Sequence, residues 1–419
     1  MYKKSRVKNS NTKRKQFKGK LFKGLNHTLK GGKYLGEGTY GCVVSPAIQC
    51  KKNLQNPRTK LNNKQLSKSV SKIVMSSREH KTEIDISNKL KKLDPQQQYF
   101  ITFEDACYLK EIPKERSNTV SVEYNNDSLE NYDIINNKKK MDKQFCKIDM
   151  RYKPINLVMP YGGSDLFDIL DSTKNSPQLT EMRKLTITNF KQCFKNLLQG
   201  ILKMHEAGIV NRDIKIENIM VKYNESTRSV VMRFIDFGLS DVLSPEFCSQ
   251  YNNISMHGTE GLIPPEIIIS YYLTNKAYFS NVKDKINKGI KYIKDILATD
   301  INEYKMVSQI DTIVQQLYNR IQTEINNKTI LNRYFGKSSS NQNVDKFNGY
   351  LQKGDIFGIG LTMYMFLEIY RSRFRMNEYE RLLNVKKNPQ LYDLLLHMIE
   401  LDSDKRYNII QCLKHPYFA

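Results

Sequence analysis

One short stretch in the middle of the chain decides the fold prediction: Val210-Asn211-Arg212-Asp213-Ile214-Lys215-Ile216-Glu217-Asn218. It carries an acid, a lysine two residues later and an amide five residues after the acid. Two apolar runs follow, Ile219-Met220-Val221 and Val230-Val231-Met232, and the polar residues between them predict a hairpin. A second motif, Phe234-Ile235-Asp236-Phe237-Gly238, then places another acid at the end of an apolar strand.

These residue types are the set that phosphoryl transfer requires. A carboxylate receives the proton of the attacking hydroxyl, a cation steadies the phosphate, and an amide oxygen and a second carboxylate hold Mg²⁺. The two motifs resemble the catalytic loop and the Asp-Phe-Gly element of eukaryotic protein kinases. The alternative, two unrelated loops with ordinary turn acids, does not explain why both occur in this order. The resemblance implies catalytic roles for Asp213, Lys215 and Asn218, and Mg²⁺ ligands in Asn218 and Asp236.

A glycine-rich segment, Tyr34 to Val44, lies near the start of the ordered sequence. Its GxGxxG pattern also occurs in dinucleotide folds, but here a strand continues where a dinucleotide site would open a helix. The segment therefore resembles the kinase loop whose backbone amides lie over the ATP phosphates, where glycine permits close approach. The resemblance implies ATP contacts from Leu35, Gly36, Glu37, Gly38, Thr39, Tyr40, Gly41, Cys42 and Val43.

A short strand, Val70-Ser71-Lys72-Ile73-Val74, carries one lysine and resembles the kinase Val-Ala-Ile-Lys strand. Lys72 would then bind the ATP phosphates, whereas the alternative is a surface lysine on an edge strand. Helical periodicity runs from Arg78 to Leu93. In the resemblance this is the regulatory helix, and Glu83 pairs with Lys72, with Glu79 as the competing partner one turn earlier.

The segment Ile155 to Leu166 resembles the strand and hinge that hold adenine in kinases. Met159 would stand at the back of the adenine pocket, the Pro160 carbonyl and the Gly162 N–H would bind adenine, and Tyr161 lies between them. Asp165 is expected either to accept a hydrogen bond from the ribose or to cap a helix, and the sequence leaves both open.

The predicted C-terminal half begins with an amphipathic helix from Thr186 to Ala207, in which His205 is expected to be structural. The segment Gly258 to Glu266 resembles the end of a kinase activation segment, and Asp355-Ile356-Phe357-Gly358-Ile359-Gly360 resembles the start of the central helix. Arg406 would be the buried partner of Glu266. Thr259 is expected to bridge Asp213 and Lys215, and Lys215 and Thr259 together indicate Ser/Thr specificity.

Two residues of the catalytic stretch leave activity and regulation open. Asn211 replaces the usual histidine, so it keeps part of the hydrogen bonding but loses ring packing. Arg212 can clamp a phosphate with two parallel hydrogen bonds. It predicts that phosphorylation between Ser244 and Ser255 orders the activation segment. The alternative is that Arg212 hydrogen-bonds loop carbonyls and the enzyme is constitutively active.

The resemblance covers nearly all of the chain after residue 32 and implies an α+β, bilobal protein-kinase fold. A small β-rich N-lobe with one main helix spans residues 33–161, and a larger helical C-lobe spans 162–419. Residues 1–32 are expected to be a disordered basic tail. Polar, Lys/Asn-rich stretches predict insertions at about 45–68, 111–150 and 271–350.

Composition limits the setting of the protein. The net charge is +24, and the first 33 residues supply half of it with twelve Lys or Arg and no acid, so the tail is either a polyanion- or nucleic-acid-binding arm or a solvated one. Seven scattered cysteines without a CxxC pair suggest neither a disulfide frame nor a zinc site, and a reducing compartment fits. No apolar run is long enough to span a membrane and no secretory signal is present, which predicts an intracellular, non-secreted protein.

The resulting hypothesis is a monomeric Ser/Thr protein kinase that uses ATP and Mg²⁺ on a protein substrate. A pseudokinase that serves as an ATP-binding scaffold is the first alternative, and the complete set Lys72, Asp213, Asn218 and Asp236 speaks against it. A small-molecule kinase of related fold is the second, and the segment around Thr259 speaks against it because it shapes a peptide groove. Abundant Lys, Asn and Ile without Trp indicate an AT-rich genome, and the chain resembles kinases of large cytoplasmic DNA viruses.

Overall fold

The computed structural model describes residues 33–38, 41–50, 61–74, 78–109, 154–243, 258–259, 262–264, 266–267, 319, 341–374, 387–400 and 402–419. The expected tail, the insertion at 111–150, most of that at 271–350, Thr39, Tyr40 and the serines from Ser244 to Ser255 lie outside these residues.

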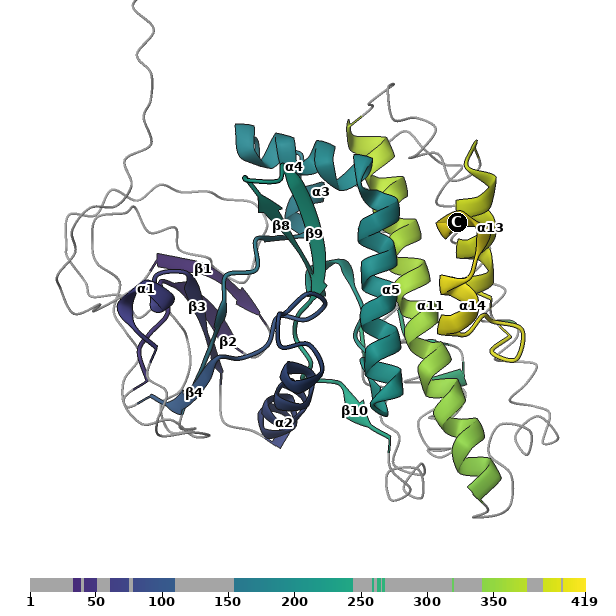
Figure 1. Ribbon diagram of the computed structural model, residues 1–419, viewed down its shortest axis with the longest axis horizontal. Coiled ribbons are helices and arrows are strands. Elements are labelled where there is room, and N and C mark those ends of the chain that lie inside the picture. Colours follow the sequence, from purple (N-terminus) through teal and green to yellow (C-terminus); the bar gives the residue numbers. More distant parts are fainter. Residues whose placement is uncertain are drawn as a thin grey trace, which may run out of the picture.

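The N-terminal part is an antiparallel sheet with the strand order β1-β2-β3-β5-β4 (Figure 1). Its strands are β1 (Lys33–Gly38), β2 (Gly41–Ser45), β3 (Ser69–Val74), β4 (Asp105–Tyr108) and β5 (Ile155–Pro160). Helix α2 (Arg78–Leu93) lies beside the sheet, and its Ile84 packs with Val74 and Leu157 of β3 and β5. The predicted bounds of this helix are confirmed. The short helix α1 (Asn63–Leu66) precedes β3 and is closed by a capping box between Asn62 and Gln65.

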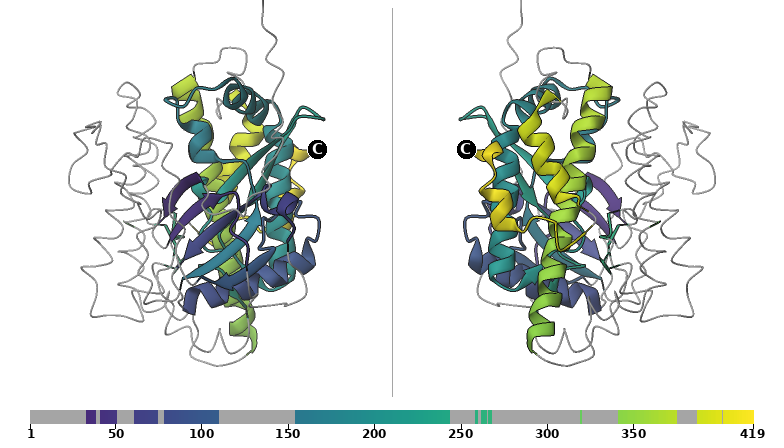
Figure 2. Two further views of the ribbon diagram at one scale, coloured as in Figure 1. Left: turned by 90° about the vertical axis from the view of Figure 1, so that its left-hand side faces the viewer. Right: turned by 90° about the vertical axis from the view of Figure 1, so that its right-hand side faces the viewer.

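The C-terminal part is mainly helical, as the two views in Figure 2 show. Its helices are α3 (Leu166–Leu170), α4 (Pro177–Thr188), α5 (Phe190–Glu206), η2 (Ile216–Asn218), α11 (Asn341–Phe374), α13 (Pro389–Met398), α14 (Ile409–Leu413) and η7 (Pro416–Phe418). Its strands are β6 (Ser164–Asp165), β7 (Ile209–Val210), β8 (Ile219–Asn224), β9 (Ser229–Phe234) and β10 (Asp241–Val242). The predicted hairpin is confirmed as β8 and β9, and the whole agrees with the expected α+β division.

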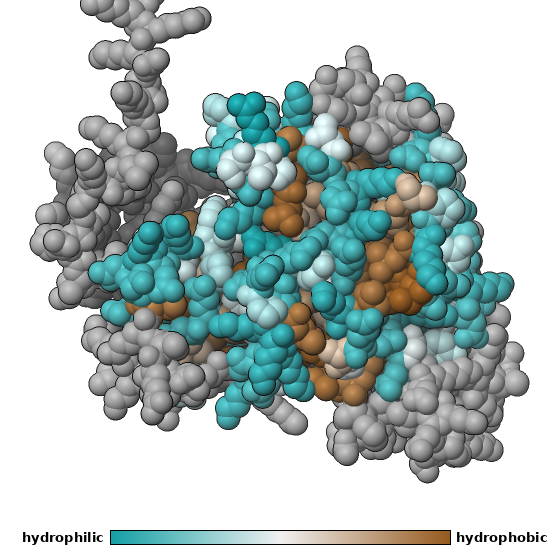
Figure 3. Space-filling view, in the orientation of Figure 1, coloured by the Kyte–Doolittle hydropathy of each residue, from teal (hydrophilic) through white to brown (hydrophobic). Residues whose placement is uncertain are grey.

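One large apolar core holds the helices together. Phe190 of α5 stacks on Phe366 of α11, with ring centroids 6.2 Å apart. Nearly every residue of α11 from Ile356 to Tyr370 is buried, as expected for a helix surrounded by others. On the face drawn in Figure 3, hydrophobic residues form separate patches within a mainly hydrophilic surface. None of the described helices is long and apolar enough to cross a membrane.

Two helix boundaries differ from the sequence prediction. The helix expected from Thr186 begins at Phe190, because α4 ends at Thr188 and Asn189 separates the two helices. The central helix, expected to start at Asp355, begins at Asn341. Residues 341–350, which the sequence analysis assigned to an insertion, form the first turns of α11, and Tyr350 and Leu351 are buried.

The connection after β2 is also more integrated than the expected insertion at 45–68. The Ala47 N–H donates to the Ser69 carbonyl at 2.9 Å, and Ala47 and Leu66 are buried together. Cys50 and Cys107 form a disulfide between this connection and β4, which contradicts the expectation that no disulfides form. Both cysteines are buried, so the fold places side by side two residues that no spacing pattern links.

Candidate active site

The candidate site contains a lysine that lies between two carboxylates. Lys72 Nζ lies 2.8 Å from Glu83 Oε1 of α2 and 3.0 Å from Asp236 Oδ1. The expected Lys72–Glu83 pair is therefore present. Burial would lower the pKa of the lysine, but Glu83 and Asp236 outweigh it and raise that pKa. Desolvation would raise the pKa of Asp236, yet Lys72 holds it below its usual value, so both groups stay charged.

Asp236 reaches this position because the neighbouring phenylalanine is anchored. Phe237 is buried and packs edge-on against Phe100, with ring centroids 5.9 Å apart. Asp236 adopts a left-handed backbone with φ of 61°, which turns its carboxylate back toward the cleft. The Asp236 side chain is 42% exposed, so it remains open to a ligand.

The catalytic stretch brings a carboxylate, an ammonium and a hydroxyl together. Thr259 Oγ1 donates to Asp213 Oδ1 at 2.8 Å and accepts from Lys215 Nζ at 3.0 Å. Lys215 Nζ also lies 2.9 Å from Asp213 Oδ2. The bridge expected of Thr259 is therefore present.

Asn218 completes the arrangement. Its Nδ2 donates to both the backbone carbonyl and Oδ2 of Asp213, each at 2.9 Å. The amide nitrogen is thus occupied, which leaves the amide oxygen as a ligand atom.

Asp355, which the sequence analysis placed only at the start of a helix, anchors the backbone of the catalytic stretch. Asp355 of α11 accepts from the backbone N–H groups of Asn211 and Arg212, each at 2.8 Å, and lies 3.0 Å from His205 Nε2. The interior of α11 thus fixes the loop backbone, and His205 is structural as expected. Asp355 was missed as a loop anchor because its partners are distant in sequence.

Asn211 stands in place of the usual histidine, and its side chain makes a hydrogen bond within the catalytic stretch. Its Oδ1 accepts from the Asp213 N–H at 3.0 Å, and Ser240 Oγ donates to its carbonyl at 3.2 Å. The residue is buried. Asn211 therefore orients the backbone of Asp213 directly, which compensates in part for the ring.

The donor set suits a magnesium ion. Among the described residues, no group of three or more His, Cys, Asp and Glu side chains is arranged for a metal. The Asn218 oxygen and the Asp236 carboxylate are hard ligands, and Mg²⁺ usually takes one or two such groups and completes its shell with phosphates and water. These residues fit the expected ion.

The hinge presents a backbone acceptor to the cleft. The Tyr161 N–H donates to the Lys68 carbonyl at 3.0 Å, so it faces the residue just before β3. Because a trans peptide points its C=O opposite to the following N–H, the Pro160 carbonyl faces the other edge. On that edge β4 does not extend as far as Pro160, because its first residue, Asp105, pairs with Val158. Gly162 is tightly enclosed, and a Cβ at this position would lie 2.7 Å from Ile101 Cδ1. The same residue lies next to Met220, which sequence reasoning had not assigned to the pocket.

Asp165 caps helix α3, which was one of its two expected roles. Its Oδ1 accepts from the Asp168 N–H at 2.6 Å. Burial raises the pKa of Asp165 to about 6, and the neighbouring acids Asp168 and Glu217 add to the rise. The expected ribose contact stays a prediction.

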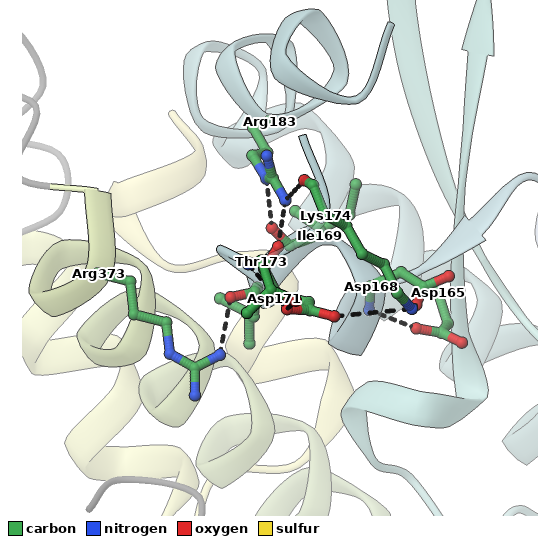
Figure 4. A network of polar contacts seen from close by, with 9 residues as sticks. Asp165, Asp168, Ile169, Asp171, Thr173, Lys174, Arg183 and Arg373 are labelled. Carbon is green, nitrogen blue, oxygen red and sulfur yellow. Dashed lines mark hydrogen bonds and ion pairs between the residues drawn. The ribbon is translucent and has the colours of Figure 1, made fainter. Parts of the chain in front are cut away.

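Two arginines hold the C-terminal end of helix α3 (Figure 4). Arg183 Nε donates to the Ile169 carbonyl at 2.9 Å, and Arg373 Nη1 donates to the Leu170 carbonyl at 2.7 Å. Lys174 Nζ reaches back to Asp168 Oδ1 at 2.5 Å. The network holds α3, and with it Asp165, against α4 and α11.

The glycine-rich segment is a hairpin of β1 and β2. Gly36 pairs with Val43, Glu37 with Cys42 and Gly38 with Gly41. A Cβ on Gly41 would lie 2.0 Å from the Ile73 carbonyl oxygen, so only glycine fits against β3. Leu35 is exposed.

A buried ion pair joins Arg406 and Glu266 in the helical part of the protein. Arg406 Nη2 lies 3.0 Å from Glu266 Oε2, and Nη1 contacts Oε1 of the same carboxylate. The Arg406 side chain is fully buried and its guanidinium carbon lies 4.9 Å from the Phe357 ring centroid. The expected pairing of Arg406 with Glu266 is confirmed.

The comparison with known proteins agrees with this geometry. The sequence model of the protein kinase domain matches residues 29–418, and the chain therefore belongs to the protein kinase domain family. This membership implies the bilobal fold.

Individual relatives match a shorter part of the chain. A probable serine/threonine-protein kinase fhkB of Dictyostelium discoideum is 33% identical over 116 residues, which is 27% of this chain and 10% of the relative. The serine/threonine-protein kinase PTK2/STK2 of Saccharomyces cerevisiae is 31% identical over 128 residues, 29% of this chain and 14% of the relative. The mouse serine/threonine-protein kinase DCLK3 is 32% identical over 116 residues, 27% of this chain and 12% of the relative. The chain thus matches only about a tenth to a seventh of the length of these relatives.

Proposed function

We propose that the protein is a Ser/Thr protein kinase that transfers the γ-phosphate of ATP to a protein hydroxyl. The observation that carries the proposal is the position of Lys72 Nζ between Glu83 Oε1 and Asp236 Oδ1, at 2.8 and 3.0 Å. This contact joins α2, β3 and the Asp-Phe-Gly turn into one ATP-phosphate site. A pseudokinase scaffold is disfavoured because no member of the set is substituted.

Each residue then has one task. Asp213 accepts the proton of the substrate hydroxyl, and Thr259 and Lys215 orient its carboxylate. Lys72 holds the ATP phosphates, and Pro160 offers its carbonyl to the adenine amino group. Asn218 and Asp236 would hold Mg²⁺, which neutralises charge on the phosphate oxygens when bound. The hydrogen bonds of Thr259 with Asp213 and Lys215 support the hydroxyl of a peptide side chain as the phosphate acceptor.

The test is phosphate transfer from ATP and Mg²⁺ to a generic basic protein, followed by phosphoamino-acid analysis. Wild-type protein should produce phosphoserine or phosphothreonine, and Asp213→Asn should lose transfer by roughly 100-fold or more while still binding ATP. The matched control Glu225→Gln, in the exposed β8–β9 turn, should behave as wild type. Equal turnover in wild type and Asp213→Asn would reject the assignment, whereas ATP binding without transfer in wild type would favour the scaffold.

The setting of the protein is a separate part of the proposal. The basic charge of residues 1–32 supports an arm that binds polyanions, and deletion of residues 1–30 should weaken that binding without changing turnover on a short peptide. Equal affinity for heparin at matched salt before and after deletion would reject it. An intracellular, monomeric enzyme from a large DNA virus remains our proposal, supported by composition alone. The cysteines no longer contribute to that support, because the Cys50–Cys107 disulfide is of a kind that is rare in reducing compartments.

A further inference from the structure

Arg212 and Asp241 form an ion pair beside the catalytic loop, through Arg212 Nη1 and Asp241 Oδ2. The arginine side chain is 8% exposed and that of the aspartate 24% exposed. Asp241 lies in β10 opposite Val210 of β7, with Val242 opposite Ile209. The pair therefore fastens the strand after the Asp-Phe-Gly turn to the residues that lead into Asp213.

The backbone at Arg212 needs such a fastening. Its φ is 67°, in the left-handed region that side-chain-bearing residues rarely adopt. Conformations of this kind persist only where the surroundings determine them. Asp355 fixes the Arg212 N–H from one side, and Asp241 fixes the guanidinium from the other. Because Asp213 is the next residue, the position of its carboxylate depends on both contacts.

The charge of this pair bears directly on regulation. A phosphate on the activation segment carries a charge of about −1.5 to −2 and gains most from an arginine that lacks another anion. Here a carboxylate already contacts Arg212, and a phosphate brought to the same guanidinium would lie beside it and be repelled. Ser240, next to Asp241, is buried and donates its hydroxyl to the Asn211 carbonyl, so it belongs to the folded support.

We propose that Asp241 is the resident counterion of Arg212 and a positioning residue for the catalytic loop, so that turnover does not require a phosphate on the activation segment. The inference rests on the proposed kinase function and specifies its regulation. Asp241 acts through Arg212 and does not touch the substrate.

The first experiment compares wild-type protein before and after phosphatase treatment, with removal of phosphate verified by intact-protein mass spectrometry. We expect the same kcat in both samples. Asp241→Asn should lower kcat by about tenfold in phosphate-free protein, with KM for ATP unchanged because Lys72 and the hinge are untouched. Asp241→Glu should restore most of the rate, and Glu225→Gln should show none of the loss. In an Arg212→Ala background, Asp241→Asn should cause little further loss, since its partner is already gone.

A second readout does not need turnover. Hydrogen exchange of the amides of residues 209–215 should be faster in Asp241→Asn than in wild type and unchanged in Glu225→Gln. Loss of wild-type activity on phosphatase treatment overturns the inference and leaves the proposed function intact. If no sample transfers phosphate, the proposed function fails and the statement about turnover fails with it, and the exchange data then decide whether Asp241 positions the loop. Equal exchange in Asp241→Asn and wild type then overturns it.

Discussion

Thr259 Oγ1 donates a hydrogen bond of 2.8 Å to Asp213 Oδ1, across a separation of 46 residues. The contact sets the rotation of the carboxylate that would receive the substrate proton. Thr259→Val keeps the shape and removes the hydroxyl, so we expect kcat to fall about 10- to 100-fold, because a small misplacement of a catalytic group is costly. Thr259→Ser should retain most of the rate. The measurement is steady-state kinetics on a short peptide, and a Thr259→Val enzyme with wild-type kcat would show that the contact is incidental.

The Lys72–Glu83 pair predicts that activity and stability can be separated. Glu83 is 2% exposed in its side chain, so Lys72→Met leaves a buried carboxylate without its cation. Removal of one partner of a buried pair costs about 3–5 kcal/mol, and we expect a clear fall in the free energy of unfolding. The double variant Lys72→Met/Glu83→Gln should recover much of that stability and none of the phosphotransfer. Chemical denaturation and a transfer assay on the same preparations measure both. Recovery of activity in the double variant would contradict the role of Lys72.

The raised pKa of Asp165 predicts a particular pH dependence of stability. Its pKa rises from 3.8 to about 6, so the folded protein binds this proton more tightly than the unfolded chain. The contribution therefore stabilises the fold as pH falls from about 6 to about 4 and disfavours it above about 6. Asp165→Asn keeps a good helix cap, so it should flatten this trend and raise Tm at pH 7. Thermal denaturation from pH 4 to pH 7, with Glu225→Gln as control, provides the test. A wild-type trend in Asp165→Asn would refute the assignment.

The Cys50–Cys107 disulfide closes a loop of 57 residues. A covalent closure of this length restricts the unfolded chain and contributes about 4 kcal/mol. We expect the double variant Cys50→Ala/Cys107→Ala to unfold at lower denaturant concentration than wild type in non-reducing buffer. Cys412→Ala, which truncates a buried cysteine outside any disulfide, measures the packing cost alone. Peptide mapping after thiol alkylation should show residues 50 and 107 protected. The alkylation is done in denaturant without reductant, because burial alone would shield free thiols at these positions in the folded protein. Labelling of both residues under these conditions would show that the disulfide is absent.

Patterns that lie within one element were predictable from the sequence. Helix α2 was located from Arg78 to Leu93 because its apolar residues recur at helical spacing, and the hairpin of β8 and β9 because a polar turn separates two apolar runs. The first ten residues of α11 were assigned to the predicted insertion because 341–350 is polar and Asn-bearing. The start of the central helix was placed fourteen residues late, at Asp355, because a family motif and not a helix-capping signal located it.

Contacts between residues far apart in the sequence were predictable only where a family motif specifies both partners. The Lys72–Glu83 and Arg406–Glu266 pairs were found through family motifs that specify both partners. The Asp241–Arg212 pair and the Cys50–Cys107 disulfide have no such motif. The first depends on the register of two strands of two residues each, and the second on a fold that brings β4 next to the connection after β2. Side-chain type alone does not determine either.

The buried bond between Glu266 and Arg406 has a consequence for how this chain can change in length. It joins residues 140 apart, and α11, in which Tyr350 and Leu351 are buried, returns the chain to the core. The entropy of closing a loop grows only logarithmically, so each doubling of the chain between two such fixed points costs about 0.6 kcal/mol. The entropy that this bond must offset therefore changes little when the number of residues between its two partners changes. Related chains are expected to keep these two residues even where the length of chain between them differs.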